Sequence, residues 1–218
     1  MRCVADIPAL SRDALAARLA RELPDLVLEP AAVGRLHAHY EELRRWAPRI
    51  DLVGPGAAGE LPERHYAEAL AALAWIPSAA RRLVDLGSGA GFPGFVLATA
   101  RPDLEVWLIE PRARRAAFLA AAARRARLSL RVVNARVTAA SLPELPTEID
   151  VLTVRALRLE SRAYGALLPC LAAGARLLSW SGEAAPELPA GFSAGRTRWL
   201  GGSDRRVLRE YLVRPEPA

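Results

Sequence analysis

The chain has 218 residues, of which 52% are hydrophobic and 25% charged, so it can bury one good-sized core. No apolar run reaches the roughly 20 residues that span a bilayer. Its net charge of +6 reflects 30 arginines and no lysine, which favours a polyanionic partner but is equally typical of a GC-rich genome. Cys3 and Cys170 are too few for a disulfide framework or a zinc cluster, so we expect no metal. The N-terminus lacks the apolar stretch of a signal peptide, so we expect a cytoplasmic protein without a membrane segment.

The first third of the chain is predicted to be helical. Leucines recur every four residues over residues 11–23, with Ser11 as the N-cap. A second amphipathic helix is expected over residues 30–46 and a third over residues 63–76, with a glycine-rich loop before the third. We therefore predict a helical N-terminal extension over residues 1–78.

From residue 79 to residue 218, strand-like and helix-like segments alternate. The expected strands are 82–86, 104–110, 130–133, 149–155, 176–180 and 207–213. The expected helices are 93–101, 113–127, a short one at 138–142, and 161–172. Such alternation predicts an α/β domain whose mostly parallel sheet is covered by helices on both faces. Residues 181–206 are rich in Gly and Pro, and a hairpin ending in the last strand would suit an antiparallel sheet edge.

A glycine-rich segment comes directly after the first of these strands, at residues 85–94, with the sequence DLGSGAGFPG. Proline, here Pro93, is favoured in the first turn of a helix, because the N–H group that it lacks would have no partner there. The segment therefore predicts a strand, a tight turn and a helix N-terminus. This arrangement lets a ligand approach backbone N–H groups and the positive end of a helix dipole.

Two acidic residues point to the ligand. Glu110 ends the next expected strand, where a carboxylate can bind both ribose hydroxyls of a nucleoside, although it could equally cap the following helix. Residues 89–94 fit the dinucleotide pattern GxGxxG, which leaves an NAD-dependent oxidoreductase as an alternative. Asp85 would repel a pyrophosphate but suits an ammonium group, and the chain offers only one nucleoside-binding half. We therefore favour S-adenosylmethionine and a methyltransferase.

The segment after the fourth expected strand bears on the methyl acceptor. It holds no Asn/Asp-Pro-Pro-aromatic motif, which argues against methylation of an adenine amine. Cys170 falls inside an expected helix, so we expect a buried structural cysteine rather than a nucleophile. No residue resembles a dedicated general base. Guanine N7 needs none, because its lone pair is already nucleophilic and alignment supplies most of the catalysis.

Several motifs together resemble one family over roughly residues 35–182. They are Phe92-Pro93-Gly94, Arg101-Pro102 with Glu110, Arg114-Arg115 with Phe118-Leu119, Arg136, Arg155-Ala156, Arg64-His65, and the upstream set Tyr40, Trp46 and Ile50-Asp51-Leu52. The chain is similar here to the ribosomal RNA small subunit methyltransferase G family, also called glucose-inhibited division protein B. The resemblance implies a Rossmann-like class I methyltransferase that modifies guanine N7 in 16S rRNA, with the RNA or the 30S subunit as partner, and we expect a monomer.

The resemblance also implies site residues. The expected cofactor-binding residues are Asp85, Gly87, Ser88, Gly89, Gly91, Phe92, Glu110, Arg136, Val137, Thr138 and Arg155. Arg155 is the candidate catalytic residue, reaching the cofactor or the target base, with an ion pair to Asp85 as the alternative. The candidate substrate residues are His65, Arg64, Arg114 and Arg115. His65 could equally be a packing histidine.

The chain departs from the family at positions expected to serve the substrate. Asn residues of the family appear here as Ala47 and Asp51, a Lys-Gly pair as Ser181-Gly182, and an acidic-Ser pair as Glu68-Ala69. These changes leave open a paralogue with a small-molecule acceptor. Arginines cluster on the expected helix 113–127 and at Arg44, Arg45 and Arg49, where they can bind phosphates or form a solvated surface.

Overall fold

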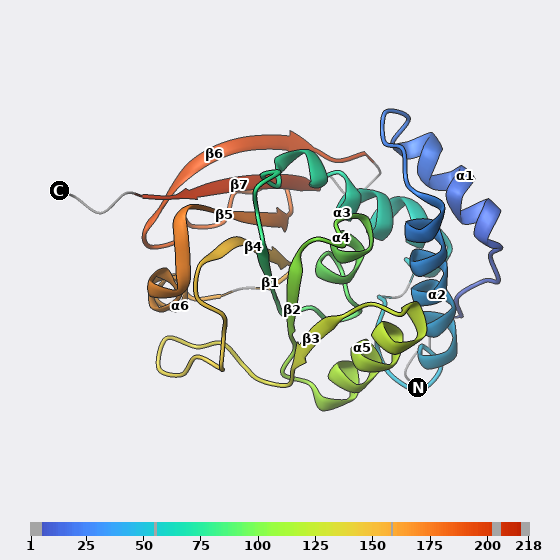
Figure 1. The fold of residues 1–218 in the computed structure, drawn as a ribbon, viewed down its shortest axis with the longest axis horizontal. Helices are drawn as coiled ribbons and strands as arrows, with labels where there is room; N and C mark the ends of the chain where they lie inside the picture. Colours follow the sequence, from blue (N-terminus) through green and yellow to red (C-terminus); the bar gives the residue numbers. More distant parts are fainter. Residues whose placement is uncertain (1–5, 55, 158, 202–205, 215–218) are drawn as a thin grey trace.

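A computed structural model describes residues 6–54, 56–157, 159–201 and 206–214. Its centre is one seven-stranded sheet with the strand order β3-β2-β1-β4-β5-β7-β6 (Figure 1). The strands are β1 Arg82–Leu86, β2 Glu105–Ile109, β3 Leu130–Val133, β4 Ile149–Arg155, β5 Leu171–Ser181, β6 Phe192–Trp199 and β7 Val207–Val213. Strands β1 to β5 run parallel, whereas β7 pairs antiparallel with both β5 and β6. The predicted mostly parallel sheet with an antiparallel edge is confirmed.

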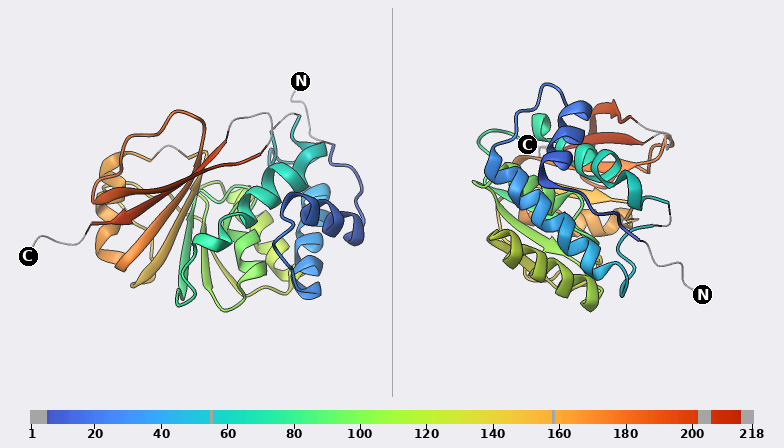
Figure 2. Two further views of the ribbon diagram at one scale, coloured as in Figure 1. Left: turned by 90° about the horizontal axis from the view of Figure 1, so that it is seen from above. Right: turned by 90° about the vertical axis from the view of Figure 1, so that its right-hand side faces the viewer.

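Helices cover both faces of the sheet (Figure 2). The regular helices are α1 Arg12–Glu22, α2 Pro30–Trp46, α4 Gly94–Ala100, α5 Ala113–Ala126 and α6 Ser161–Leu167. Helices α4 and α5, together with the N-terminal helices, pack on one face, and α6 packs on the other. Strand side chains alternate between the faces, so Leu83 of β1 belongs to the first core and its neighbour Val84 to the second.

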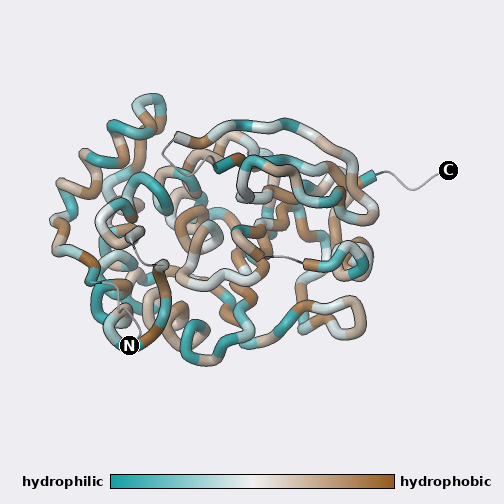
Figure 3. The backbone as a smooth tube through the Cα atoms, turned by 180° about the vertical axis from the view of Figure 1, so that it is seen from behind, coloured by the Kyte–Doolittle hydropathy of each residue, from teal (hydrophilic) through white to brown (hydrophobic). Residues whose placement is uncertain are grey.

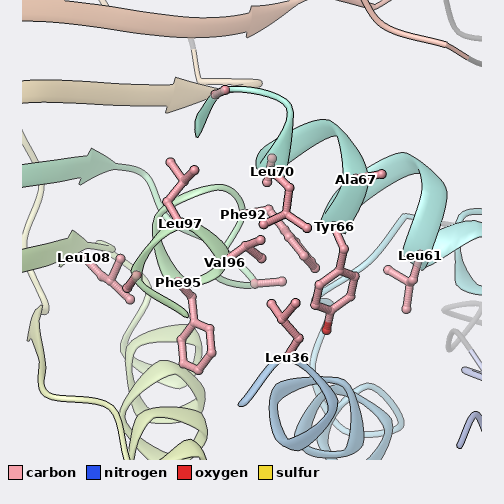
Figure 4. Close-up of a cluster of buried hydrophobic side chains, with 14 of the residues drawn as sticks. Leu36, Leu61, Tyr66, Ala67, Leu70, Phe92, Phe95, Val96, Leu97 and Leu108 are labelled. Atoms are coloured by element: carbon pink, nitrogen blue, oxygen red, sulfur yellow. The ribbon is translucent and has the colours of Figure 1, made fainter. Parts of the chain in front are cut away.

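The N-terminal part shares its core with the sheet domain. Fully buried Tyr40 and Tyr66 lie in the same cluster as Phe95 and Phe118, and Figure 4 shows Tyr66 and Phe92 side by side within it. Burying each such aromatic ring contributes about 1.5–3 kcal/mol. Hydrophobic stretches gather along the central strands, while hydrophilic stretches lie toward the outer helices (Figure 3). The division into 1–78 and 79–218 stays a prediction, and the two parts are joined by continuous packing.

The third N-terminal helix is less regular than expected. In place of the helix expected over residues 63–76, the structure has a π-helical segment, η2 Pro62–Ala67, followed by a short α3 Glu68–Leu70 and a 3-10 turn, η3 Leu73–Trp75. Another 3-10 turn, η1 Ala58–Glu60, precedes these elements. π-helical segments often occur at functional sites. None of the helices within the described ranges is long and apolar enough to cross a membrane.

Three expected elements differ from the structure. The helix at 138–142 is wrong, because the Thr138 hydroxyl accepts a hydrogen bond from Ser141 N at 3.1 Å and holds a turn instead. The helix expected at 161–172 ends at Leu167, and a 3-10 turn that contains Pro169, η4 Leu168–Cys170, follows it. Cys170 is therefore not buried within a helix: it is half-buried and directly precedes a strand. Strand β5 begins at Leu171 instead of Arg176, with a register shift near Gly174, whose φ is +74°. Cys3 lies outside the described residues.

Candidate functional site

The glycine turn after β1 has the geometry that its sequence predicts. Gly87, Gly89 and Gly91 all have positive φ, at +72°, +55° and +90°, a region that only glycine adopts without strain. Gly87 N and Ser88 N donate to Ile109 O at 2.8 and 3.1 Å, which ties the turn to the end of β2. The buried Ser88 hydroxyl donates to Asp85 O, so this side chain holds the turn from inside.

Asp85 lies beneath the turn. Its carboxylate is fully buried and accepts hydrogen bonds from Thr153 Oγ1 at 2.6 Å and from Gly94 N at 3.3 Å. Burial, offset in part by these donors, raises the pKa of Asp85 to about 6. Both carboxylate oxygens have protein donors, so Asp85 positions the turn and the start of α4. The expected contact of this carboxylate with an ammonium group of the ligand stays a prediction.

Glu110 fits both of the roles considered for it. One carboxylate oxygen accepts from Gly89 N in the turn at 2.8 Å, and the other accepts from Arg112 N at the N-cap of α5, also at 2.8 Å. The side chain is 3% exposed. A carboxylate has about four acceptor positions, so these bonds leave capacity for ligand hydroxyls.

The loop after β3 lies beside this carboxylate. Asn134 Nδ2 donates to Glu110 O at 2.9 Å, which brings the loop to the carboxyl ends of β1 and β2. Val137 and Thr138 are half-buried, and Arg136 is exposed. The expected adenine loop therefore adjoins the expected ribose residue.

Arg155 ends β4 and pairs with a different acid from the one expected. One guanidinium nitrogen, Nη2, donates to Glu68 Oε2 and to Arg64 O, both at 2.7 Å, so the partner is Glu68 and not Asp85. The other nitrogen, Nη1, is buried without a hydrogen-bond partner among the described residues. Desolvation lowers the pKa of Arg155 to about 10, which leaves it charged at neutral pH. A buried charged donor without a partner is costly, so this nitrogen has free capacity for an acceptor atom.

His65 lies between Arg155 and the turn. Its ring stacks on Phe92, with centroids 4.9 Å apart, and neither ring nitrogen has a hydrogen-bond partner among the described residues. Burial first, and then the nearby charges of Arg155 and Arg206, lower the pKa of His65 to about 2. The ring is neutral at physiological pH, and it offers one donor and one acceptor beside the turn.

Arginines border the opposite end of the turn. Arg115 donates from Nε to Asp51 O at 2.9 Å, and a Cβ on Gly89 would lie 3.8 Å from Arg115 Nη1. Arg114 is exposed. A basic pocket of about 480 Å³ is lined by Arg49, Ile50, Asp51, Arg112, Ala113, Arg114 and Arg115. The side chain of Asp51, one of the departures from the family, also contacts this arginine, with Oδ2 3.5 Å from Arg115 Nη2.

A larger cavity of about 810 Å³ opens between the segment after β4, α6, β5 and the loop that follows β5. Leu157, Tyr164, Trp180 and Tyr211 form much of its apolar lining. Leu157 also approaches the turn, because a Cβ on Gly87 would lie 2.9 Å from its Cδ2. Across the described ranges, no group of three His, Cys, Asp or Glu side chains could hold a metal ion.

Sequence reasoning missed three buried polar residues that support the site: Thr153, Glu68 as the partner of Arg155, and His39. Thr153 interrupts the apolar strand 149–155, His39 lies on the buried face of the helix 30–46, and Glu68 is buried beside Ala69 and Leu70. A polar residue on such a face must find a partner inside the protein, and that is the signal that could have identified them.

Comparison with known proteins gives one consistent result. The chain matches the model of a family described as rRNA small subunit methyltransferase G over residues 33–187. It is 40% identical over 154 residues to the ribosomal RNA small subunit methyltransferase G of Paramagnetospirillum magneticum, covering 70% of this chain and 72% of that protein. It is 38% identical over 159 residues to the protein of the same name from Rhodospirillum rubrum, covering 73% and 77%.

Solved structures share the fold at low identity. A SAM-dependent methyltransferase from Aquifex aeolicus is 15% identical with a TM-score of 0.54, covering 73% of this chain and 93% of that one. A mutant of MtNAS in complex with S-adenosylmethionine is 16% identical with a TM-score of 0.57, covering 93% and 78%. These likenesses show the Rossmann-like fold of class I methyltransferases.

Proposed function

Because the chain belongs to the rRNA small subunit methyltransferase G family, we propose that it transfers a methyl group from S-adenosylmethionine to N7 of a guanine in 16S rRNA. Family membership favours this function over an NAD-dependent oxidoreductase. The substrate is then the RNA or the 30S subunit, and the enzyme acts in the cytoplasm.

The site residues are consistent with the donor. The three positive-φ glycines present no side chain of their own to a ligand, and Glu110 and the loop 136–138, which are expected to meet the ribose and the adenine, adjoin the turn. The observation that carries the proposal furthest is the buried, unpartnered Nη1 of Arg155, beside the turn and next to His65. A carboxylate or a base carbonyl is the kind of acceptor that such a nitrogen requires.

Alignment, rather than proton transfer, is what these residues can contribute. S-adenosylmethionine supplies a methyl group on a positively charged sulfonium, and N7 of guanine already carries a lone pair. The residues around Arg155 contain no group poised as a base, since His65 has a pKa of about 2 and Glu68 is held by Arg155. In this proposal Arg155 orients the donor or the target base. The rings of Phe92 and His65 present a flat surface to it, and burial of the site excludes water.

Arginine side chains on the same edge suit a polyanionic substrate. Arg112, Arg114 and Arg49 line the basic pocket beside the turn, where they can neutralise backbone phosphates. Phosphate contacts of this kind position the RNA but do not select the base.

A small-molecule acceptor is the second candidate, and one observation favours it. The cavity of about 810 Å³ next to Leu157 has a mixed apolar and polar lining, and Ser181 and Gly182 line it where the family has a Lys-Gly pair. Arg209 from β7 donates to Ser181 Oγ and to Gly182 O, so this cation is engaged by the loop itself.

Methyl transfer from labelled S-adenosylmethionine to undermethylated 30S subunits tests the proposal. We expect label in 16S rRNA, released as 7-methylguanine on digestion. Label found only in small molecules would instead support the second candidate.

A further inference from the structure

His39 of α2 connects the N-terminal helices to the glycine turn. Its Nε2 lies 2.9 Å from the carbonyl oxygen of Ala90, and its Nδ1 lies 2.7 Å from the hydroxyl of Tyr66 in η2. The ring is fully buried and stacks on Phe95 of α4, with centroids 4.3 Å apart. A residue some fifty positions upstream in the sequence thus contacts the backbone of the turn itself.

Chemistry fixes the direction of both hydrogen bonds. A carbonyl oxygen can only accept, so Nε2 carries the proton and donates to Ala90. Burial lowers the pKa of His39 to about 3, so the ring is neutral and Nδ1 must accept from the Tyr66 hydroxyl. Figure 4 shows Tyr66 reaching from its helix toward α2. Tyr66 thereby selects the tautomer of His39, and His39 orients the Ala90 carbonyl.

That carbonyl belongs to the peptide group at the middle of the turn. Its other end, Gly91 N, donates to Ser88 O at 2.7 Å, so the Ala90–Gly91 peptide is held at both edges. Gly89 N, one peptide earlier, is bonded to Glu110. A Cβ on Gly91 would lie 3.0 Å from His39 Nε2, which shows how closely the histidine approaches the turn.

We propose that His39 is a positioning residue for the methyl donor: it holds the Ala90–Gly91 peptide, and with it the Gly89–Glu110 contact, in the conformation that the donor binds. The N-terminal helical part is then a component of the cofactor site as well as a support for the fold. This inference rests on the proposed function, because S-adenosylmethionine is the ligand concerned. A turn held before binding does not have to be ordered during binding, which strengthens the affinity.

Two substitutions at one position separate positioning from packing. In His39→Gln the amide can reach the place of Nε2 and still donate to Ala90, whereas the shorter amide of His39→Asn reaches only the place of Nδ1. Both variants lose the aromatic stacking on Phe95. His37→Asn on the same helix is the matched control, because His37 contacts Leu10 O at 2.8 Å, away from the turn.

The measurement is the dissociation constant of S-adenosylmethionine by calorimetry in the absence of RNA, together with melting temperatures. We expect His39→Asn to bind about tenfold more weakly, as for the loss of one buried hydrogen bond, with His39→Gln and His37→Asn close to wild type. KM for S-adenosylmethionine should rise in His39→Asn while kcat at saturation stays near wild type. Equal affinities of the folded Gln and Asn variants would show packing alone and overturn the inference.

Tyr66→Phe decides the matter if His39→Asn does not fold, because it removes one oxygen atom and keeps the ring. A weaker affinity for S-adenosylmethionine supports the inference, and an unchanged affinity contradicts it. A wild-type protein that gives no heat with S-adenosylmethionine would instead contradict the proposed donor itself, which distinguishes the two failures.

Discussion

Among single residues, Asp85 shows what the motif alone does not reveal. Its place before the glycines predicts a contact with the ligand, which stays a prediction, and its side chain also accepts hydrogen bonds from Thr153 and Gly94 N. The sequence places the carboxylate at the end of β1 and does not reveal that β4 supplies a hydroxyl opposite it. Long-range partners such as Thr153 and Asp85, or Glu68 and Arg155, come from the register of the sheet and the packing of η2, which local patterns do not encode.

Asp85 should make stability depend on pH in a defined direction. Its pKa is raised from 3.8 to about 6 in the folded protein, so the folded state binds the proton more tightly than the unfolded state. The contribution of Asp85 to the free energy of unfolding is therefore fully present below pH 3.8, and it is lost as the pH rises through 6. The Thr153 hydroxyl stabilises the charged carboxylate, and its loss costs more when Asp85 is ionised.

We therefore expect Thr153→Val to destabilise by about 2 kcal/mol at pH 8 and by about 1 kcal/mol at pH 4.5. Urea unfolding at both pH values measures the difference. A loss of the same size at the two pH values would contradict the assignment. Ser193→Ala, on the edge strand β6, is the control, because its hydroxyl donates to the backbone oxygen Leu212 O at 3.3 Å, and its loss should show no pH dependence.

The buried pair of Arg155 and Glu68 should be costly to break. Their side chains are 7% and 5% exposed, so removal of the acid leaves a charge inside the protein. We expect Glu68→Ala to lose about 3–5 kcal/mol of unfolding free energy and to abolish methyl transfer, because Arg155 loses its orientation.

A surface pair provides the comparison. Glu105 and Arg82 are 44% and 38% exposed, and Glu105→Ala should change stability by less than about 1 kcal/mol and leave activity intact. Chemical denaturation and the transfer assay measure both variants. A Glu68→Ala enzyme with wild-type activity would remove Arg155 from the site.

Among the elements, the strands of the sheet were predicted better than the irregular segments. The bounds of β1, β3, β4 and β7 match the sequence prediction, because uninterrupted apolar runs between turn residues are a direct signal of buried strands. The π-helical η2 and the bulged start of β5 were not predicted, and for β6 the sequence indicated only a hairpin ending in the last strand, without bounds for its first strand. Their local sequences are compatible with several structures, and tertiary packing selects among these.

Helix α4 depends on a glycine that the motif places at its first residue. A Cβ on Gly94 would lie 2.5 Å from Asp85 Cβ and 2.7 Å from Leu108 Cδ2, so the helix N-terminus touches β1 and β2 directly. We expect Gly94→Ala to force these elements apart, to destabilise by about 2 kcal/mol or more, and to weaken donor binding.

Gly34 is the matched control for this prediction. It lies within α2, and a Cβ there would meet nothing within 4 Å. Gly34→Ala should stabilise by about 0.5–1 kcal/mol, because alanine loses less backbone entropy in a helix. Thermal unfolding of the two variants should shift in opposite directions, and a stabilising Gly94→Ala would contradict the close contact.

In the whole molecule, the N-terminal helices, the glycine turn and the end of β4 meet at the carboxyl edge of the parallel sheet. His39 and His65 reach this edge from the N-terminal part, Glu110 from β2 and Arg155 from β4. Ligands bind at this edge in open α/β sheets, because strand ends and helix N-termini converge there. The arginines beside it face outward, which suits a macromolecular substrate.

The central claim is that this edge methylates guanine N7 in 16S rRNA, and the most direct test is the position of the transferred methyl group. Wild-type enzyme and Arg155→Ala are incubated with labelled S-adenosylmethionine and undermethylated 30S subunits, and the digested RNA is resolved by mass spectrometry. We predict 7-methylguanine from the wild type and none from Arg155→Ala, with both proteins folded. Methylation of another base or atom, or RNA that stays unmethylated while the wild type binds S-adenosylmethionine, would contradict the claim.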